Sequence, residues 1–369
     1  MALTDSIPGA GVPPPPPAAG PGGMGRLRSL GRRHRLARYI GLRVLLLLPQ
    51  LLGITFVTFI LIRLLPGDPA YLLAGPTATK DTIAQIRQSL GLNRPLLVQF
   101  WLYLDGLLHG NLGQSFRTGK PVLYDVLHRL PATLELVIPT LAIGLALGIG
   151  LGVYAAFHEG SRIERLLSIY ARLAGSLPEW WLGLILIFFF YYKLRWAPPP
   201  LGRLGITTPP PTSITNSYAV DALLTGNWSA LWSALTHLVL PIVTFSVAAI
   251  APFMKMTRAT MIEILNSDYI RNAAALGLPR RAITRTALKN SLPPVVTLAG
   301  FLSSYLIGGA VLIETVFSWG GFGQYAVQSL VNSDYTALQG FVLVSALFTL
   351  AVYFIVDLLY LALDPRIQY

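Results

Sequence analysis

The segment SDYIRNAAALGLPRRAITRTALKNSLPP (residues 267–294) is polar and basic, rich in alanine, and lies between two long apolar stretches. Ser267 can cap a helix that begins at Asp268, because an acidic residue is favourable at the positive end of a helix. Gly277 suits the position just past a helix end, where the backbone adopts a left-handed conformation. The pattern therefore predicts a short helix over 268–276.

A second helix is predicted after Pro279, over about 279–290, and leads into the next apolar stretch. A helix as short as the first is only marginally stable in water, so we expect it to lie against something. Its small residues permit a close approach by a partner, and an aromatic and a cationic residue flank them. The candidate contact residues are Asp268, Tyr269, Ile270, Arg271, Ala273, Ala274 and Gly277. From these residues alone, docking to a protein and contact of a basic loop with anionic lipid both remain open.

The composition indicates a membrane protein. Of the 369 residues, 53% are hydrophobic and 12% are charged, against about 25% charged in soluble domains. The absence of cysteine excludes disulfides, iron–sulfur clusters and thiolate zinc sites, and the five histidines show no metal-ligand spacing. The net charge of +12 gathers beside apolar stretches and comes without aromatic-plus-basic surface motifs, so we expect no nucleic-acid binding.

Six stretches are long and apolar enough to span a bilayer, which predicts an all-α polytopic membrane protein. An even number of spans puts both termini on one side. Basic loops mark the cytoplasmic side, which makes 158–167 and 257–292 cytoplasmic and 316–337, without lysine or arginine, extracytoplasmic. Both termini are then cytoplasmic. The predicted spans are 42–64, 133–157, 168–192, 236–256, 293–315 and 338–361.

Outside the spans, residues 1–37 are predicted to be a disordered Pro/Gly-rich and basic tail. Residues 65–132 are expected to form an extracytoplasmic lobe, with two short amphipathic helices separated at Gly91 and Pro95. The next outer loop opens with APPPLGRLGITTPPPTS (197–213), which cannot form regular structure. Further along, DALLTGNW (221–228) predicts a short helix.

Gly144, Gly148 and Gly152 recur every four residues in the second predicted span. They share one face and allow another helix to come close. We favour tight packing within this chain over a moving interface.

Ionisable residues inside spans are functional candidates by default. Glu179 lies near the middle of the third span, where it could face a translocation path or pair with Arg172. Glu314 and Asp357 are further candidates for the path, with structural hydrogen bonding as the favoured alternative. Arg63, at the end of the first span, is expected to snorkel outward.

DYIRNAAALGL followed by ALKNSLPPVV resembles the cytoplasmic coupling segment of ABC-importer permeases of the dipeptide/oligopeptide/nickel type. The resemblance covers about residues 38–367, assigned as the permease transmembrane domain, with 257–292 as its coupling loop. Asn272, Ala274 and Leu276 depart from the family pattern. Seven further pieces agree in order: LLPGDPA (64–70), LGLNRPLLVQF (90–100), GNLGQSF (110–116), DALLTGNW (221–228), HLVLPIVT (237–244), ETVFSWGGFGQ (314–324) and DLLYLALDPRI (357–367).

The resemblance implies a permease subunit of an ATP-driven importer in the bacterial inner membrane. The expected partners are a second homologous permease, two ATP-binding subunits, an extracytoplasmic solute-binding protein, a peptide substrate and the lipid bilayer. The sequence has no Gly-x-x-x-x-Gly-Lys-Ser/Thr motif, so we expect no cofactor in this chain, with ATP and Mg²⁺ bound by the partner ATPases. The coupling segment would pass the movement of the ATPases to the spans on either side of it.

Three alternatives were weighed. Nickel or nickel-chelate import belongs to the same family, and the absence of clustered His and Cys disfavours it only weakly. An ion-coupled secondary transporter would require charges at mid-depth on broken helices, and only Glu179 fits that description. A membrane enzyme is disfavoured, since no paired carboxylates, Ser/His/Asp set or His-Glu-x-x-His motif occurs in a span.

Overall fold

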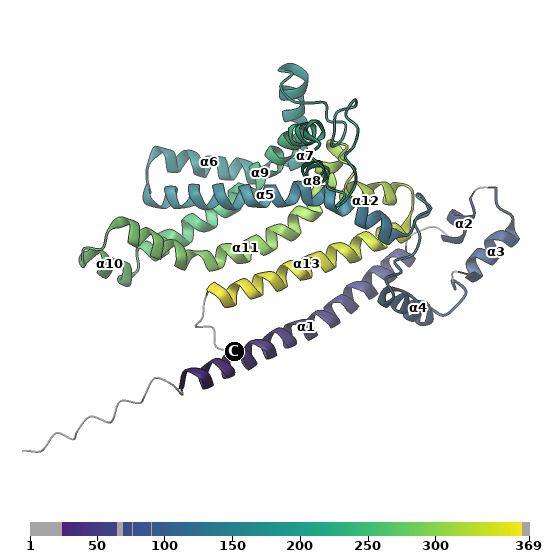
Figure 1. The fold of residues 1–369 in the computed structure, drawn as a ribbon, viewed down its shortest axis with the longest axis horizontal. Coiled ribbons are helices and arrows are strands. Elements are labelled where there is room, and N and C mark those ends of the chain that lie inside the picture. Colours follow the sequence, from purple (N-terminus) through teal and green to yellow (C-terminus); the bar gives the residue numbers. More distant parts are fainter. Residues whose placement is uncertain (1–23, 65–68, 76, 90, 364–369) are drawn as a thin grey trace, which may run out of the picture. The chain divides into compact units, whose positions relative to one another are not determined.

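The computed structural model describes residues 24–64, 69–75, 77–89 and 91–363. All regular elements in these ranges are helices, apart from one isolated bridge between Gln114 and Pro121, which confirms the predicted all-α fold (Figure 1). The chain divides into two units, residues 1–48 with 368–369, and residues 49–367. The smaller unit contains the first part of α1 (Met24–Leu64), and the larger unit contains every other described element.

After α1, most helices follow one another with short connections, and the longer ones are residues 109–121 between α4 and α5 and the irregular segment between η1 and α8. They are α2 (Pro69–Ala74), α3 (Lys80–Ser89), α4 (Leu96–Leu108), α5 (Val122–Phe157), α6 (Arg162–Ser176), α7 (Glu179–Leu186), the π-helical η1 (Ile187–Lys193), α8 (Tyr218–Leu224), α9 (Trp228–Leu265), α10 (Asp268–Ala275), α11 (Arg280–Val316), α12 (Phe322–Val331) and α13 (Tyr335–Leu363).

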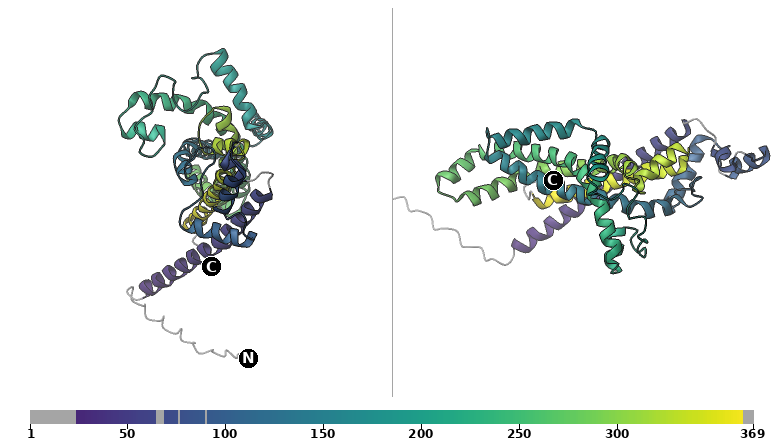
Figure 2. Two further views of the ribbon diagram at one scale, coloured as in Figure 1. Left: turned by 90° about the vertical axis from the view of Figure 1, so that its right-hand side faces the viewer. Right: turned by 90° about the horizontal axis from the view of Figure 1, so that it is seen from above.

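Within the described residues, five helices are long and apolar enough to cross a membrane, and a bent pair could provide a sixth span. The five lie within α1, α5, α9, α11 and α13. The prediction of one continuous span over 168–192 is wrong. The chain forms α6 and α7 instead, which meet at 104° (Figures 1 and 2). Leu177 precedes Pro178 and has an extended backbone, φ −91° and ψ 129°, because the proline ring disfavours helix at the residue before it.

The helices α5, α9 and α11 all continue well beyond the predicted spans. The separate helix predicted over 279–290 is the first part of α11, which runs through Pro293 and Pro294 without ending. Likewise α5 begins before the predicted span, inside the segment assigned to the extracytoplasmic lobe. Proline is tolerated within membrane helices because neighbouring helices and hydroxyl side chains satisfy the freed backbone groups, so proline alone is a poor marker of helix ends here.

The core of the larger unit lies where α5, α9 and α11 pack together, around Leu136, Phe245 and Leu306. The three predicted glycines of α5 are buried in this contact. A methyl group at Gly152 would lie 2.7 Å from Thr257 Cβ and 2.8 Å from the carbonyl oxygen of Met254 on α9. The glycines therefore let the backbones of α5 and α9 come close, which confirms tight packing within the chain.

The N-terminal region differs from the predicted tail, because α1 begins at Met24, ahead of the boundary placed after residue 37. The remaining tail, 1–23, lies outside the described residues. In the predicted outer lobe, α3 and α4 lie where two short helices were expected, and they are separated at Gly91, which has a φ of +65°.

Candidate functional site

The coupling segment forms a short helix that connects two long ones. α10 begins after Ser267 and ends at a C-terminal cap in which Leu278 N donates to Ala273 O (3.2 Å) and Gly277 N donates to Ala274 O (3.0 Å). With Gly277 at φ +78°, this pair of bonds is a Schellman cap, which confirms the predicted helix end. The predicted side-chain cap is wrong, because the Ser267 hydroxyl donates to the carbonyl of Ile264 instead of accepting from α10.

One apolar side chain holds α10 to the rest of the chain. Ile270 is only 5% exposed, on a helix that packs against α9 and α11. Tyr269 adds a second attachment, since its hydroxyl accepts a hydrogen bond from Asn290 Nδ2 at 3.0 Å. The expectation that Ile270 contacts a partner therefore needs correction, because the chain itself covers this side chain.

The opposite side of α10 is open. On the side away from Ile270, Ala275 is exposed, and Leu276 at the helix end is 81% exposed. Arg271 and Asp268 form a loose exposed pair at 3.9 Å, which is worth little in stability. α10 thus presents Ala275 and Leu276 outward together with polar and charged side chains, while Ile270 fixes its position.

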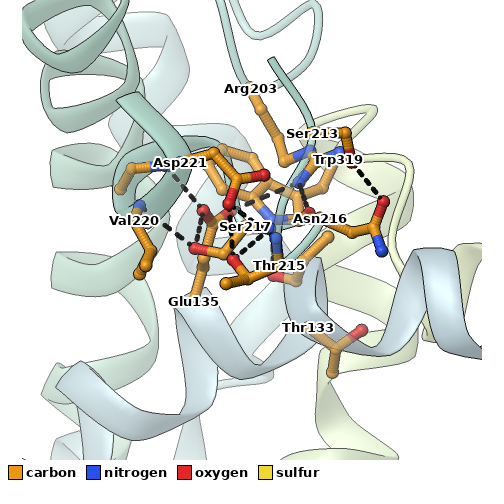
Figure 3. A network of polar contacts seen from close by, with 12 residues as sticks. Thr133, Glu135, Arg203, Ser213, Thr215, Asn216, Ser217, Val220, Asp221 and Trp319 are labelled. Carbon is orange, nitrogen blue, oxygen red and sulfur yellow. Dashed lines mark hydrogen bonds and ion pairs between the residues drawn. The ribbon is translucent and has the colours of Figure 1, made fainter. Parts of the chain in front are cut away.

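A second polar region lies around the first half of α5 (Figure 3). Glu135, on α5, accepts hydrogen bonds from Ser217 Oγ at 2.7 Å and Ala219 N at 2.9 Å. Its other oxygen lies 3.5 Å from Arg203 Nη1, and both side chains of this ion pair are nearly buried. Arg203 also donates to Asn216 O at 3.1 Å and covers the ring of Tyr218. These contacts fasten the irregular segment before α8 to α5.

Asp221 orders the turn that leads into α8. It is fully buried, and its Oδ1 accepts hydrogen bonds from both the backbone N and the hydroxyl of Thr215, each at 2.7 Å (Figure 3). Burial alone would raise the pKa of Asp221, but these bonds and those from the neighbouring backbone outweigh it, so the pKa lies below its ordinary value. The carboxylate therefore stays ionised in the fold.

Glu314 is enclosed at the end of α11. It accepts a hydrogen bond from the Thr133 hydroxyl, and its other oxygen accepts one from Gln324 N (2.7 Å) in the first turn of α12. The same Thr133 hydroxyl accepts from Phe322 N at 2.8 Å. A carboxylate at a helix N-terminus is stabilised by the free backbone N–H groups there. In this conformation Glu314 joins α5, α11 and α12, which favours the structural alternative over a place on a path.

Glu179 and Asp357 lie elsewhere. Glu179 is in the first turn of α7, directly after the break between α6 and α7. It is half-buried and hydrogen-bonds the Tyr305 hydroxyl on α11. Among the described ion pairs none joins it to Arg172. Asp357 is half-buried towards the end of α13. The structure describes no contact that brings Glu179, Glu314 and Asp357 together.

Glu135, Arg203 and Asp221 were not among the predicted site residues. A signal was present for Glu135, since a carboxylate inside a predicted span is a candidate by default. Arg203 lies in the irregular segment before α8 and Asp221 lies in α8. Their roles depend on contacts that no local sequence pattern indicates. Arg63 was expected to snorkel, and its Nε donates to Gln99 Oε1 at 3.0 Å.

Several long apolar helices, with a short capped helix exposed between two of them, define an integral membrane protein of the transport-permease class. The chain belongs to the family described as binding-protein-dependent transport system inner membrane component. That family's model matches residues 148–369, and the model of its N-terminal region matches residues 33–137.

Curated relatives cover most of the chain. The probable D,D-dipeptide transport system permease DdpB of Escherichia coli K12 is 44% identical over 85% of this chain and 93% of its own length. The dipeptide permease DppB of Alkalihalophilus pseudofirmus is 38% identical over 89% and 98%. The di/tripeptide permease DppB of Pseudomonas aeruginosa UCBPP-PA14 is 37% identical over 90% and 98%. The chain is therefore similar to peptide permeases along nearly its whole length.

Proposed function

We propose that this chain is the membrane-spanning subunit of an ATP-driven importer that moves peptides across the inner membrane by alternating access. Its similarity to dipeptide and di/tripeptide permeases supports a peptide substrate over nickel. Its membership of a binding-protein-dependent family supports a solute-binding protein as the source of substrate and displaces the ion-coupled alternative.

The observation that carries this proposal is the geometry of α10. A helix held by one buried isoleucine, with its opposite side open, is suited to seat in a partner and to pass movement to the long helices on both sides. The partners are two ATP-binding subunits and a second homologous permease. ATP and Mg²⁺ belong to the ATP-binding subunits, and this chain has no catalytic role of its own.

The proposed orientation follows from the position of α10. If α10 meets ATP-binding subunits, the loop between α9 and α11 is cytoplasmic, and so are both termini. The basic residues around α10 support this side, since positive charge is retained there. The irregular segment before α8, with its Glu135–Arg203 contact, then lies on the extracytoplasmic side, where a solute-binding protein arrives.

Uptake in proteoliposomes tests the proposal. The chain is reconstituted with the partner subunits encoded beside it, and uptake of a radiolabelled dipeptide is compared with uptake of ⁶³Ni²⁺. We expect dipeptide uptake that requires ATP and the binding protein and is abolished by vanadate. Uptake of nickel but not of dipeptide would replace the substrate, and uptake driven by an ion gradient without ATP would overturn the mechanism.

A further inference from the structure

α4 carries a strongly apolar exposed face in a segment predicted to lie outside the spans. Leu97, Trp101 and Leu108 are 69%, 68% and 87% exposed. Their spacing of four and seven residues places them on one side of the helix. Asp105, the only charged residue of α4, is also exposed and lies four residues after Trp101, so one carboxylate borders this face. Leaving three large apolar side chains in water forgoes the free energy of their burial, which favours an apolar environment for this face.

The opposite side of α4 is fixed to the last turns of α1. Phe100 is buried and its ring lies 5.2 Å from the rings of both Phe56 and Phe59. Gln99, also buried, accepts from Arg63 Nε and donates to the carbonyl of Arg94 at 2.8 Å. These contacts hold α4 at the end of the first apolar helix, where the chain leaves the hydrocarbon region.

The exposed surface of α1 continues into that of α4. Leu52 and Phe56 on α1 are exposed. Exposed apolar side chains are expected on a transmembrane helix that lies at the edge of the bundle and faces lipid. Phe56 touches Phe100, so the lipid-facing side of α1 and the apolar side of α4 adjoin.

The length and composition of α4 indicate a helix that lies at the membrane surface and does not cross the membrane. With 13 residues it is too short to cross a hydrocarbon core that needs about 20. Tryptophan is enriched at the membrane–water boundary, where its indole ring is favoured. We propose that α4 is an interfacial helix, with Leu97, Trp101 and Leu108 inserted into the lipid boundary beside the end of α1.

Spin labelling tests this inference directly, because the chain contains no cysteine that would need removal. Leu97→Cys and Leu108→Cys are labelled singly in the full-length protein, assembled with its partners in nanodiscs of phosphatidylethanolamine and phosphatidylglycerol. Leu52→Cys on α1 provides the lipid-facing reference. Gln85→Cys on the exposed side of α3 provides the water-facing reference. Collisions of each label with oxygen and with a water-soluble nickel chelate are then measured.

We expect the oxygen-to-nickel collision ratio at 97 and 108 to approach the ratio at 52 and to exceed the ratio at 85. A ratio equal to that at 85 would show the face in water and overturn the inference. Protection of both labels from oxygen and from nickel would show a protein covering the face, which overturns it equally. The result depends only on the membrane placement of α1, so it stands apart from the choice of substrate in the proposed function.

Discussion

Glu135 and Arg203 bury opposite charges against each other beside the first half of α5. Removing one partner of a buried pair leaves the other charge without compensation, which costs about 3–5 kcal/mol. We therefore expect Glu135→Gln to lower the thermal unfolding midpoint of the purified protein in detergent, as followed by circular dichroism.

The control for this pair is the double variant Glu135→Gln with Arg203→Met, which removes the second charge as well. We expect the double variant to recover part of the lost midpoint. The single variant Arg203→Met completes the comparison. If the loss of unfolding midpoint in the double variant equals the sum of the losses in the two single variants, the pair is not energetically coupled.

Asp221 makes the stability of its turn depend on pH. Its pKa is lowered in the fold, so its contribution is complete above the ordinary carboxyl pKa of about 3.9. The contribution is lost as the pH falls through the folded-state value. We expect the difference in unfolding midpoint between the native protein and Asp221→Asn to be largest at neutral pH and to shrink on acidification below pH values of about 5. A difference that stays constant or grows would contradict the lowered pKa.

Two glycines of α5 provide a matched comparison of packing. Gly152→Ala would press a methyl group against Thr257 and the backbone of Met254, whereas Gly150 has nothing within 4 Å. Overpacking costs about 1–3 kcal/mol, and alanine at an open helical site gains about 0.5–1 kcal/mol over glycine. We expect Gly152→Ala to lower the unfolding midpoint and Gly150→Ala to leave it equal or higher. Equal losses at both sites would show that α5 does not pack on α9 through this face.

Among the elements, α10 shows what could and what could not be predicted from the sequence: where the helix ends, and which of its sides faces the rest of the chain. Its ends follow from local chemistry, and the left-handed glycine at 277 was predictable from residue type alone. Which side faces the chain was not predictable, because that depends on where α9 and α11 place Ile270. The break between α6 and α7 shows the same limit, since Pro178 signals a possible bend but hydropathy alone gives one span.

Substitutions on the two sides of α10 are expected to differ in their effects on transport and on stability. Ala275→Trp adds bulk on the open side, so we expect it to abolish coupled transport in proteoliposomes while the unfolding midpoint of the isolated subunit stays unchanged. Ile270→Ala removes the internal anchor and leaves a cavity, which costs about 2–5 kcal/mol, so we expect it to lower that midpoint as well as transport. Thr286→Trp, at an exposed position on α11, serves as the control for added bulk. Normal uptake by Ala275→Trp would contradict a docking role.

At the scale of the molecule, the coupling segment is linked to a helix that is not its neighbour in the sequence as well as to the two that are. The resemblance implied that the two attached helices, now α9 and α11, would follow α10. The glycine face adds α5 to this group, because backbones in such close contact cannot separate independently. Of the six spans that hydropathy predicted, five are found as single long helices. The close pairing of α5 with α9 and the contacts of Glu135 depend on residues that are distant in the sequence.

We propose above that the open side of α10 seats in an ATP-binding subunit. A photo-crosslinking amino acid at position 276, whose native leucine is 81% exposed, tests this in membranes that contain the assembled transporter. The same amino acid at position 286 is the control. We expect position 276 to form a covalent adduct with the ATP-binding subunit, with a yield that changes when ATP is added, and position 286 to form much less. Adducts at 276 with lipid alone, or none in an assembled and active transporter, would contradict the account.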